Sequence, residues 1–284
     1  YFEISEKRDD DNRIIELFED TVLNCIWATK HEFYNLIRID KKKYTIKIIP
    51  YNYNDNNNNI HKTTTIIRTF HNYNDSLLLG STYSGLYLIN KNTGSIQGPY
   101  SDTKKKTTNC TNKFIDTGDK VYFTNNNSLS YIEKSNIYEP IIKTIQTDIP
   151  GKIKLIDMYS DSTLFIYTDN TNTSELWSYN RYTGKESHIT SLHKKVNSIQ
   201  CMHDGIWLTT NNGLDFYDLR NNELRTYTTR NSSLMSNKTD AICRSKQQSI
   251  VWIGTTEGIA KIDYLSSKFS ITDLRRFSNS SSCD

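Results

Sequence analysis

Short apolar triplets recur along this chain, and each is followed by a polar turn and then by a second apolar run. The two clearest copies are Ile206-Trp207-Leu208 with Asn211-Asn212-Gly213-Leu214, and Val251-Trp252-Ile253 with Thr256-Glu257-Gly258-Ile259. Their turn glycines, Gly213 and Gly258, lie 45 residues apart. Apolar runs separated by Gly and Asn predict β-strands joined by tight hairpins, because these residues tolerate the positive φ that such turns need.

The repeat extends over the whole chain when the large central residue of each triplet is used as a marker. Six markers are found, spaced 42 to 51 residues apart: Trp27, Leu78, Tyr122, Phe165, Trp207 and Trp252. The longest spacing contains the Asn-rich stretch 52–59, which we expect to be a loop insertion. A period of about 40 to 50 residues is typical of β-propeller blades. We therefore predict an all-β fold, a β-propeller of four-stranded antiparallel blades, with six repeats readable and six or seven blades.

Each repeat divides into four expected strands. Asp204-Gly205 and Asn212-Gly213 supply the first two turns around Trp207. The expected strands around Trp207 are 196–201, 206–210, 214–218 and 223–228; around Trp252 they are 239–244, 250–255, 258–263 and 268–272; around Leu78 they are 65–70, 77–81, 85–90 and 95–100. The copies around Tyr122 and Phe165 lack the turn glycine but keep the apolar spacing. Each unit is therefore predicted to be an antiparallel meander.

One domain is predicted over residues 1–272, with 273–284 as a tail or boundary segment. No Pro/Gly-rich linker or composition break divides the chain. Residues 1–5 resemble the fourth strand of a blade. If they join the repeat around Trp252, the propeller has six blades. If they belong to a blade completed by a longer parent chain, it has seven.

Charge and hydropathy exclude some classes of function. The chain has 35 Lys and Arg against 32 Asp and Glu, a net charge of +3, which gives no global case for nucleic acid. The lysine runs 41–43 and 104–106 fall at expected turns. No apolar stretch approaches the length that spans a membrane. The first residues lack a signal-peptide pattern, so the chain is either cytosolic or a processed piece, and the strand-like start favours the second.

The residues that usually carry chemistry form no recognisable pattern. The five cysteines lack metal or redox spacing, and Cys201 and Cys243 are expected as buried thiols, with a disulfide as the alternative. The six histidines are scattered, and the acidic stretch 9–12 lacks the Gly and Glu of a calcium loop. Trp27, Trp207 and Trp252 are expected to pack between blades. We predict no catalytic residue, no metal and no cofactor.

The amino-acid sequences of the last two repeats resemble those of a known family. Residues 231–242, Asn-Ser-Ser-Leu-Met-Ser-Asn-Lys-Thr-Asp-Ala-Ile, precede Trp252-Ile253-Gly254-Thr255 and Gly258-Ile259. This order is similar to the two-component regulator propeller repeat, and residues 196–269 look like two successive copies. The resemblance implies a periplasmic or extracellular sensor region of a bacterial hybrid two-component system, often one that regulates glycan use. In that layout two propellers and a β-sandwich precede a membrane helix, a kinase and a DNA-binding regulator. This chain departs from the layout, because the β-sandwich, the membrane helix and the kinase are absent from its sequence.

The loops between second and third strands are expected to open on one face, together with the connections between blades. The candidate ligand-binding residues in these loops are Lys30, His31, Glu32, Tyr83, Asn125, Asn126, Asp169, Asn211, Asn212, Thr256 and Glu257. We expect a non-enzymatic sensor that binds a small ligand such as an oligosaccharide, without nucleic acid or membrane insertion, and with a homodimer through a longer parent as an option. The alternatives are a protein-interaction scaffold and, third, a propeller glycan hydrolase or lyase. The sequence alone does not identify the ligand.

Overall fold

The structure of the protein is a computed structural model. It describes residues 14–30, 33–54, 60–62, 67–82, 85–100, 111, 113–135, 139–170, 173–245, 250–263 and 268–272. The expected strand 1–5, the acidic stretch 9–12, the lysine run 104–106 and the tail lie outside these residues. So do three candidate site residues, His31, Glu32 and Tyr83.

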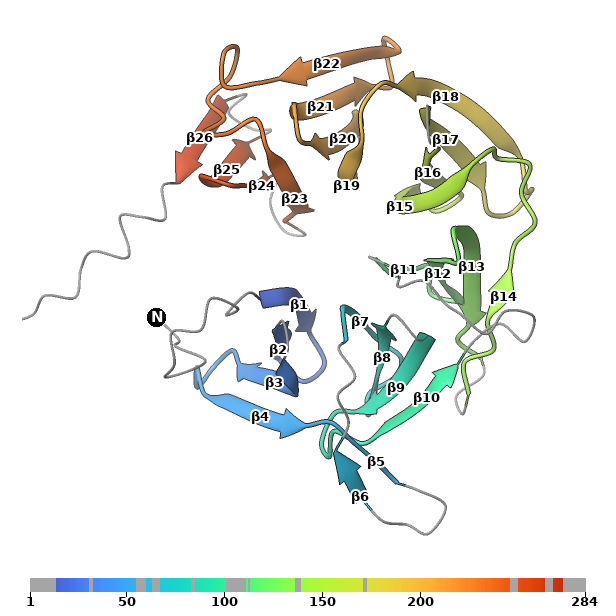
Figure 1. Cartoon of the computed structure of the whole chain (residues 1–284), viewed down its shortest axis with the longest axis vertical. Coiled ribbons are helices and arrows are strands. Elements are labelled where there is room, and N and C mark those ends of the chain that lie inside the picture. The colour runs from blue at the N-terminus through green and yellow to red at the C-terminus, as the bar shows by residue number, and fades with distance from the viewer. Residues whose placement is uncertain are drawn as a thin grey trace, which may run out of the picture. The chain divides into compact units, whose positions relative to one another are not determined.

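The chain divides into two compact units, residues 1–147 and 148–284, and each holds three four-stranded antiparallel sheets (Figure 1). In unit 1, sheet 1 is β1 (Ile14–Asp20), β2 (Cys25–Lys30), β3 (Phe33–Asp40) and β4 (Ile46–Pro50). Sheet 2 is β7 (Thr69–Asn72), β8 (Leu77–Thr82), β9 (Gly85–Asn90) and β10 (Ile96–Tyr100). Sheet 3 is β11 (Ile115–Asp116), β12 (Lys120–Asn125), β13 (Ser128–Glu133) and β14 (Lys143–Thr144).

Unit 2 repeats this arrangement. Sheet 4 is β15 (Lys152–Ser160), β16 (Thr163–Asp169), β17 (Ser174–Asn180) and β18 (Glu186–Leu192). Sheet 5 is β19 (Val196–Cys201), β20 (Gly205–Thr210), β21 (Gly213–Asp218) and β22 (Glu223–Tyr227). Sheet 6 is β23 (Thr239–Arg244), β24 (Ile250–Thr255), β25 (Gly258–Asp263) and β26 (Lys268–Thr272).

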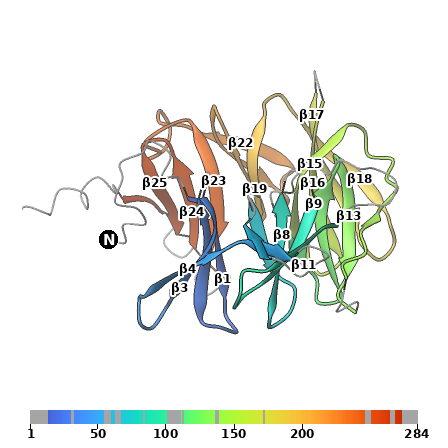
Figure 2. The same ribbon diagram turned by 60° about the horizontal axis from the view of Figure 1, so that its bottom comes forward.

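The strands of every sheet follow one another in chain order, as the blades of a β-propeller do, and the described residues contain no helix (Figure 2). The predicted fold class is therefore confirmed, with six blades in the described part of the chain. The expected strands around Trp252 agree with β23 to β26 to the residue. The prediction of one domain over residues 1–272 stays a prediction.

The Asn-rich insertion is a hairpin in part. β5 (Asn52–Asn54) pairs with β6 (Ile60–Lys62), while residues 55–59 lie outside the description. The start of β5 is attached to sheet 2, because the Asn52 amide N–H donates to the Gly94 carbonyl at 3.2 Å and its side chain donates to the Thr93 carbonyl at 3.0 Å. The insertion thus lengthens the connection between sheets 1 and 2 without altering either sheet.

A four-residue turn joins the second and third strands in sheets 2, 5 and 6. A Thr ends the second strand, and its hydroxyl donates 2.7 to 3.0 Å hydrogen bonds to the carbonyl oxygen of a Gly that begins the third strand; the pairs are Thr82–Gly85, Thr210–Gly213 and Thr255–Gly258. Each Gly has a positive φ. At Gly213, with φ 122°, a Cβ would also lie 2.4 Å from the Tyr227 carbonyl oxygen, so both backbone conformation and space require glycine.

A five-residue turn joins the third and fourth strands in sheets 1, 2, 4 and 5. The Oδ1 atom of its first residue accepts the backbone N–H groups of its third and fourth residues, and its fifth residue has a positive φ; the first residues are Asp40, Asn90, Asn180 and Asp218, and the fifth are Tyr44, Gly94, Gly184 and Asn222. Asp and Asn favour this position because their short side chains bind their own backbone two and three residues on. The same local chemistry therefore shapes four of the six sheets.

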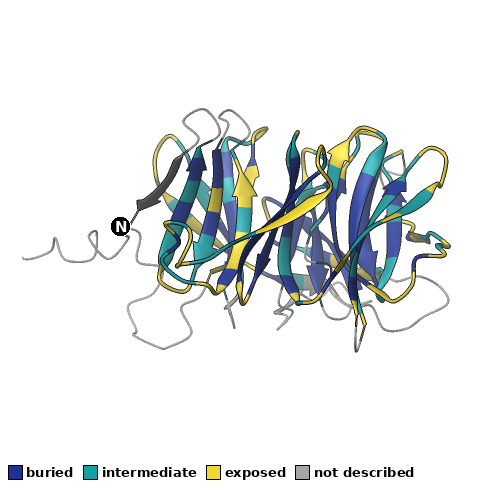
Figure 3. Cartoon of the chain, turned by 90° about the horizontal axis from the view of Figure 1, so that it is seen from above, coloured by how far each residue is buried: buried dark blue, intermediate teal, exposed yellow. Residues whose placement is uncertain are grey.

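Apolar clusters fill the space between neighbouring sheets of each unit, and buried residues are concentrated within the sheets while turns and fourth strands are more exposed (Figure 3). The sequence markers Trp27, Phe165 and Trp207 each face the next sheet of their unit. In sheet 2 the residue with this orientation is Leu79, because Leu78 packs against sheet 1. The marker in this repeat is thus displaced by one residue.

Sheet 6 corrects two expectations. Val251 and Ile253 pack against sheet 5, so strand alternation places Trp252 on the opposite face, where it is 37% exposed. Cys243, the ladder partner of Trp252, is exposed as well. The predictions that Trp252 packs between blades and that Cys243 is buried are therefore wrong, whereas Trp27, Trp207 and Cys201 are buried as expected. Cys25 is a free thiol.

Candidate functional site

The first strands of unit 2 each carry a β-bulge at the same position. The ladder skips one residue between Ile153 and Leu155 in β15, between Val196 and Ser198 in β19, and between Thr239 and Ala241 in β23; the skipped residues are Lys154, Asn197 and Asp240. These strands are neighbours, since β19 contacts both β15 and β23. A bulge turns one side chain out of the regular alternation and is common beside binding sites. Here the bulges present a cation, an amide and a carboxylate from three adjacent strands.

The Asn197 side chain connects the bulges to a second–third strand turn. Its Nδ2 atom donates to the Thr239 carbonyl at 2.9 Å and to Asn211 Oδ1 at 3.1 Å. Asp240 Oδ1 lies 3.5 Å from the same nitrogen. One amide therefore holds an exposed turn residue of sheet 5 beside the first strand of sheet 6.

The connection between sheets 5 and 6 joins the turns of both sheets. The Gly213 N–H donates to the Asn237 carbonyl at 2.7 Å, and the Thr256 N–H donates to the Lys238 carbonyl at 3.2 Å. The hydroxyls of Ser236 and Thr256 are also 2.8 Å apart. We call the resulting surface the polar rim of unit 2, formed by Lys154, Asn197, Asn211, Asn212, Asp240, Thr256 and Glu257.

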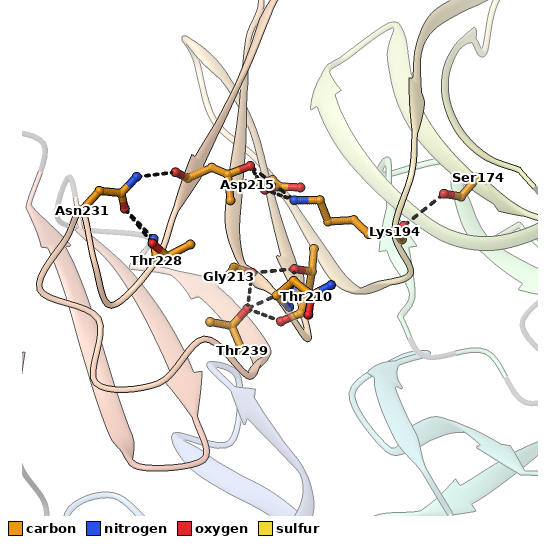
Figure 4. A network of polar contacts seen from close by, with 10 residues as sticks. Ser174, Lys194, Thr210, Gly213, Asp215, Thr228, Asn231 and Thr239 are labelled. Carbon is orange, nitrogen blue, oxygen red and sulfur yellow. Dashed lines mark hydrogen bonds and ion pairs between the residues drawn. The ribbon is translucent and has the colours of Figure 1, made fainter.

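A layer of buried hydrogen bonds supports the polar rim (Figure 4). The Thr239 hydroxyl accepts the Thr210 N–H at 2.9 Å and lies 3.0 Å from the carbonyl oxygens of Thr210 and Gly213. Between sheets 4 and 5, the Lys194 ammonium lies 2.9 Å from the fully buried Asp215 carboxylate. These contacts fix the backbone beneath the exposed amides, so the polar rim presents its donors and acceptors in a defined arrangement.

The structure brings four of the sequence-predicted site residues together. Asn211, Asn212, Thr256 and Glu257 are exposed and lie on the polar rim. Asp169 is half-buried at the end of β16, where it pairs with Ser174 across the ladder of sheet 4. These four residues and Asp169 lie in the turns between second and third strands or at the edges of those turns, as expected.

The remaining described candidates lie in unit 1. Lys30 is half-buried at the end of β2. Asn125 is buried, at 4% exposure, because the turn of sheet 3 is formed by Asn126 and Asn127, with φ 48° and 63°, and Asn125 is the last residue of the ladder. Asn126 itself is half-buried. Ligand binding by any of these residues stays a prediction.

Sequence reasoning missed Lys154, Asn197 and Asp240. Asn197 and Asp240 are the second residues of their strands and Lys154 is the third of its strand, and in a regular strand each side chain would alternate with those of its neighbours. The bulge that re-aims it has no distinct residue signature here. The Thr-x-x-Gly spacing was available in the sequence, however, and it would have marked the turns that form the polar rim.

A second cluster of ionisable groups lies along the first strands of unit 1. Burial raises the pKa of Glu16 on β1 to about 7, against the lowering effects of a hydrogen bond with Thr69 on β7 and the charge of Lys113. This carboxyl group therefore changes its protonation near neutral pH. Glu16, Thr69 and Lys113 lie on, or next to, the first strands of sheets 1, 2 and 3.

Asp116 of β11 holds the other part of this cluster together. Its Oδ2 atom lies 3.0 Å from His71 Nε2 and 2.8 Å from Lys134 Nζ, and its Oδ1 atom accepts the Gly118 N–H at 2.8 Å. Burial raises the pKa of Asp116, but His71, Lys134 and Gly118 outweigh this effect and leave the pKa well below its usual range. Beside Lys134 an open cleft of about 490 Å³ is lined by Gly118, Asp119, Lys120, Glu133, Lys134 and Ser135.

In the part of the chain that the structure describes, no three or more His, Cys, Asp and Glu side chains gather in a group that could hold a metal ion. Among the same residues there is no helix long and apolar enough to cross a membrane.

No family model and no curated protein matches the sequence. Solved structures do match. The extracellular domain of the hybrid two-component system BT4673 from B. thetaiotaomicron superposes with a TM-score of 0.66 at 16% identity, over 94% of this chain and 34% of that one. The corresponding domain of BT3049 from the same organism gives a TM-score of 0.63 at 18% identity, over 90% and 34%.

A third similar structure is PorZ, a surface component of the type IX secretion system of Porphyromonas gingivalis. Its TM-score is 0.61 at 12% identity, over 93% of this chain and 32% of PorZ. The chain thus spans about a third of the length of these three proteins. At these identities the likeness establishes the fold, and the fold agrees with the β-propeller read from the repeats.

Proposed function

We propose that this chain is the ligand-sensing propeller of an extracytoplasmic two-component receptor, and that the polar rim of unit 2 binds an oligosaccharide. The observation that carries the proposal is that Asn197 joins the sheet 5 turn at Asn211 to the first strand of sheet 6, on neighbouring first strands whose bulge residues are Lys154, Asn197 and Asp240. The structural similarity to extracellular domains of hybrid two-component systems supports the class of receptor.

The chemistry of the polar rim suits sugar hydroxyl groups. Amides both donate and accept hydrogen bonds, as hydroxyl groups do, and carboxylates accept them. Asn211, Asn212 and Asp240 are exposed, while the backbone that carries them is held by the Gly213–Asn237 hydrogen bond and the buried Thr239 hydroxyl. A ligand would therefore meet prearranged partners, which reduces the entropy lost on binding.

Calorimetry of the protein against a panel of defined oligosaccharides tests this proposal. Replacing Asn211 and Asp240 by Ala should weaken binding by about tenfold or more, because each change removes polar partners worth roughly 1 kcal/mol. Asn92→Ala is the matched control, since Asn92 is an exposed asparagine in a third–fourth strand turn. The Asn92→Ala variant should bind the oligosaccharide with the same affinity as the unmodified protein.

Either of two results would contradict the oligosaccharide proposal. The first is the absence of binding across the panel, both by this chain and by the longer receptor that contains it. The second is unchanged affinity in the Asn211→Ala, Asp240→Ala variant. A ligand can bias an output only through tighter binding to one receptor arrangement, so binding should also change the signalling state of a longer receptor.

Two other functions remain as alternatives. A protein-interaction scaffold would use a face of a sheet or its turns without a small ligand. A glycan hydrolase or lyase would draw on Glu16, which can exchange a proton near neutral pH, or on the His71–Asp116 pair. Assays for glycan cleavage, with the Glu16→Gln variant as the inactive reference, would identify the enzymatic alternative.

A further inference from the structure

Tyr182 presents an exposed aromatic ring that is held in place from one side. It lies in the turn between β17 and β18, and 62% of its surface is exposed. Its hydroxyl donates to Asp161 Oδ2 at 2.6 Å and accepts Arg181 Nη2 at 2.5 Å. The Arg181 guanidinium also lies over the ring, 4.2 Å from its centre. One face of the ring is therefore covered and fixed.

The cation beneath the ring is itself anchored. Arg181 Nη2 lies 2.9 Å from Asp161 Oδ1, its Nε atom donates to the Asp161 carbonyl, and its side chain is only 5% exposed. The Asp161 carboxylate, in contrast, is 78% exposed. The arrangement thus combines a rigid aromatic surface with an accessible carboxylate beside it.

The turn does not need an aromatic residue at this position. The third residue of the equivalent five-residue turns is Lys42 in sheet 1, Asn92 in sheet 2 and Arg220 in sheet 5, and each of these turns has the same Asx hydrogen bonds. The backbone at residue 182 is held by Asn180 Oδ1, which accepts the N–H groups of Tyr182 and Thr183 at 3.0 Å. The Tyr side chain is therefore an addition to a turn that forms without it.

The neighbouring groups select the chemistry of an occupant. A second cation would compete with Arg181 for the same ring electrons, which disfavours a Lys or Arg side chain on the open face. A large apolar partner would take the exposed Asp161 carboxylate out of water without offering it hydrogen bonds in exchange, at a desolvation cost. A pyranose ring avoids both penalties, because its C–H face packs on the aromatic ring while its hydroxyl groups donate to the carboxylate.

We propose that Tyr182, with Asp161 and Arg181, forms a saccharide-stacking site at the turn between β17 and β18. This site goes beyond the proposed function, because it lies at the opposite end of the strands from the polar rim. An elongated polysaccharide is its expected ligand, with one sugar ring on the Tyr182 ring.

Affinity electrophoresis of the full chain tests this site. Gels would contain soluble xylan, mixed-linkage β-glucan or galactomannan. At least one of these polysaccharides should retard the unmodified protein. The Tyr182→Asn variant, which carries the residue found in the sheet 2 turn, should bind that polysaccharide with a dissociation constant about tenfold higher or more. Tyr182→Phe keeps the ring but loses the hydroxyl contacts, so it should weaken binding less.

Thermal unfolding of Tyr182→Asn within a few degrees of the unmodified protein would verify that the turn still forms. The Asn211→Ala, Asp240→Ala variant separates the two proposals, because it should keep the retardation that depends on Tyr182. Equal retardation of Tyr182→Asn and the unmodified protein would overturn this proposal, and so would the absence of retardation by every polysaccharide. Retardation lost only in the Asn211 and Asp240 variant would support the polar rim alone.

Discussion

Protonation of the Glu16 carboxyl group makes the stability of unit 1 depend on pH. In the unfolded chain its carboxyl group titrates near 4.5, whereas burial in the fold raises its pKa to about 7. A group whose pKa is raised by folding contributes stability that is fully present below the unfolded pKa and is lost as the pH rises through the folded pKa. The relevant window is therefore pH 4.5 to 7.

We expect Glu16→Gln to flatten this dependence. Gln stays neutral and can still bond with the Thr69 hydroxyl, so the variant should lose less stability between pH 5 and pH 8 than the unmodified protein, by about 2 to 3 kcal/mol. Urea unfolding at the two pH values measures the difference. Glu223→Gln, at an exposed residue of β22, serves as the control. Identical pH profiles for Glu16→Gln and the unmodified protein would contradict the assignment.

Burial of single side chains was harder to foresee than strand position. The sequence places Asn125 at a turn, and the structure agrees, but a two-residue turn leaves Asn125 in the ladder with its side chain buried. Trp252 repeats the context of Trp207, yet only one of them has a neighbouring sheet of its own unit on that face. Local sequence gives the strand, whereas burial depends on what packs against it.

At the level of the elements, turn chemistry determines where strands begin and end. Gly213 combines φ 122° with a site where a Cβ would lie 2.4 Å from the Tyr227 carbonyl oxygen. We expect Gly213→Ala to cost about 2 kcal/mol or more, because the backbone must change and β22 must shift. Denaturant unfolding measures the loss.

Gly184 provides the matched control for this substitution. Its φ is 70°, nothing lies within 4 Å of a Cβ built on it, and Asn222 occupies the equivalent position in sheet 5. Gly184→Asn should therefore change stability by about 0.5 kcal/mol or less. A loss at Gly184 as large as that at Gly213 would show that close approach of Tyr227 is not the cause.

The repeat predicted the order and type of strands well, because Gly and Asn turns and apolar runs are properties of short segments. The repeat did not predict features that depend on a shift of one residue. Three successive leucines at 77–79 show no alternation, so the repeat points to Leu78, whereas in the structure Leu79 has the corresponding orientation. The bulges at Asn197 and Asp240 also depend on a one-residue offset between paired strands, which neither strand encodes alone. For the same reason the sequence found the turns of the polar rim but not its bulge residues.

At the scale of the whole chain, cohesion within each unit comes from contacts between successive sheets. Most are apolar, but sheets 1 and 2 are also joined by a buried ion pair between Asp20 and Lys91, 2.8 Å apart and no more than 1% exposed. Asp20 further accepts the Trp27 indole N–H and the backbone N–H groups of Val22 and Leu23. Burial raises the pKa of Asp20, but Lys91 and Trp27 outweigh it, so the pKa is lowered and the carboxylate stays charged.

Removing one partner of this pair should destabilise the protein more than removing both. Lys91→Met leaves the Asp20 carboxylate buried without its cation, and we expect a loss of about 2 to 4 kcal/mol, limited by the three remaining donors. Adding Asp20→Asn removes the uncompensated charge, so the double variant should recover part of that loss. A double-mutant cycle measured by urea unfolding gives the coupling between the two residues. If the single losses simply add, the ion pair does not hold sheets 1 and 2 together, and the apolar cluster around Trp27 and Leu78 alone accounts for their association.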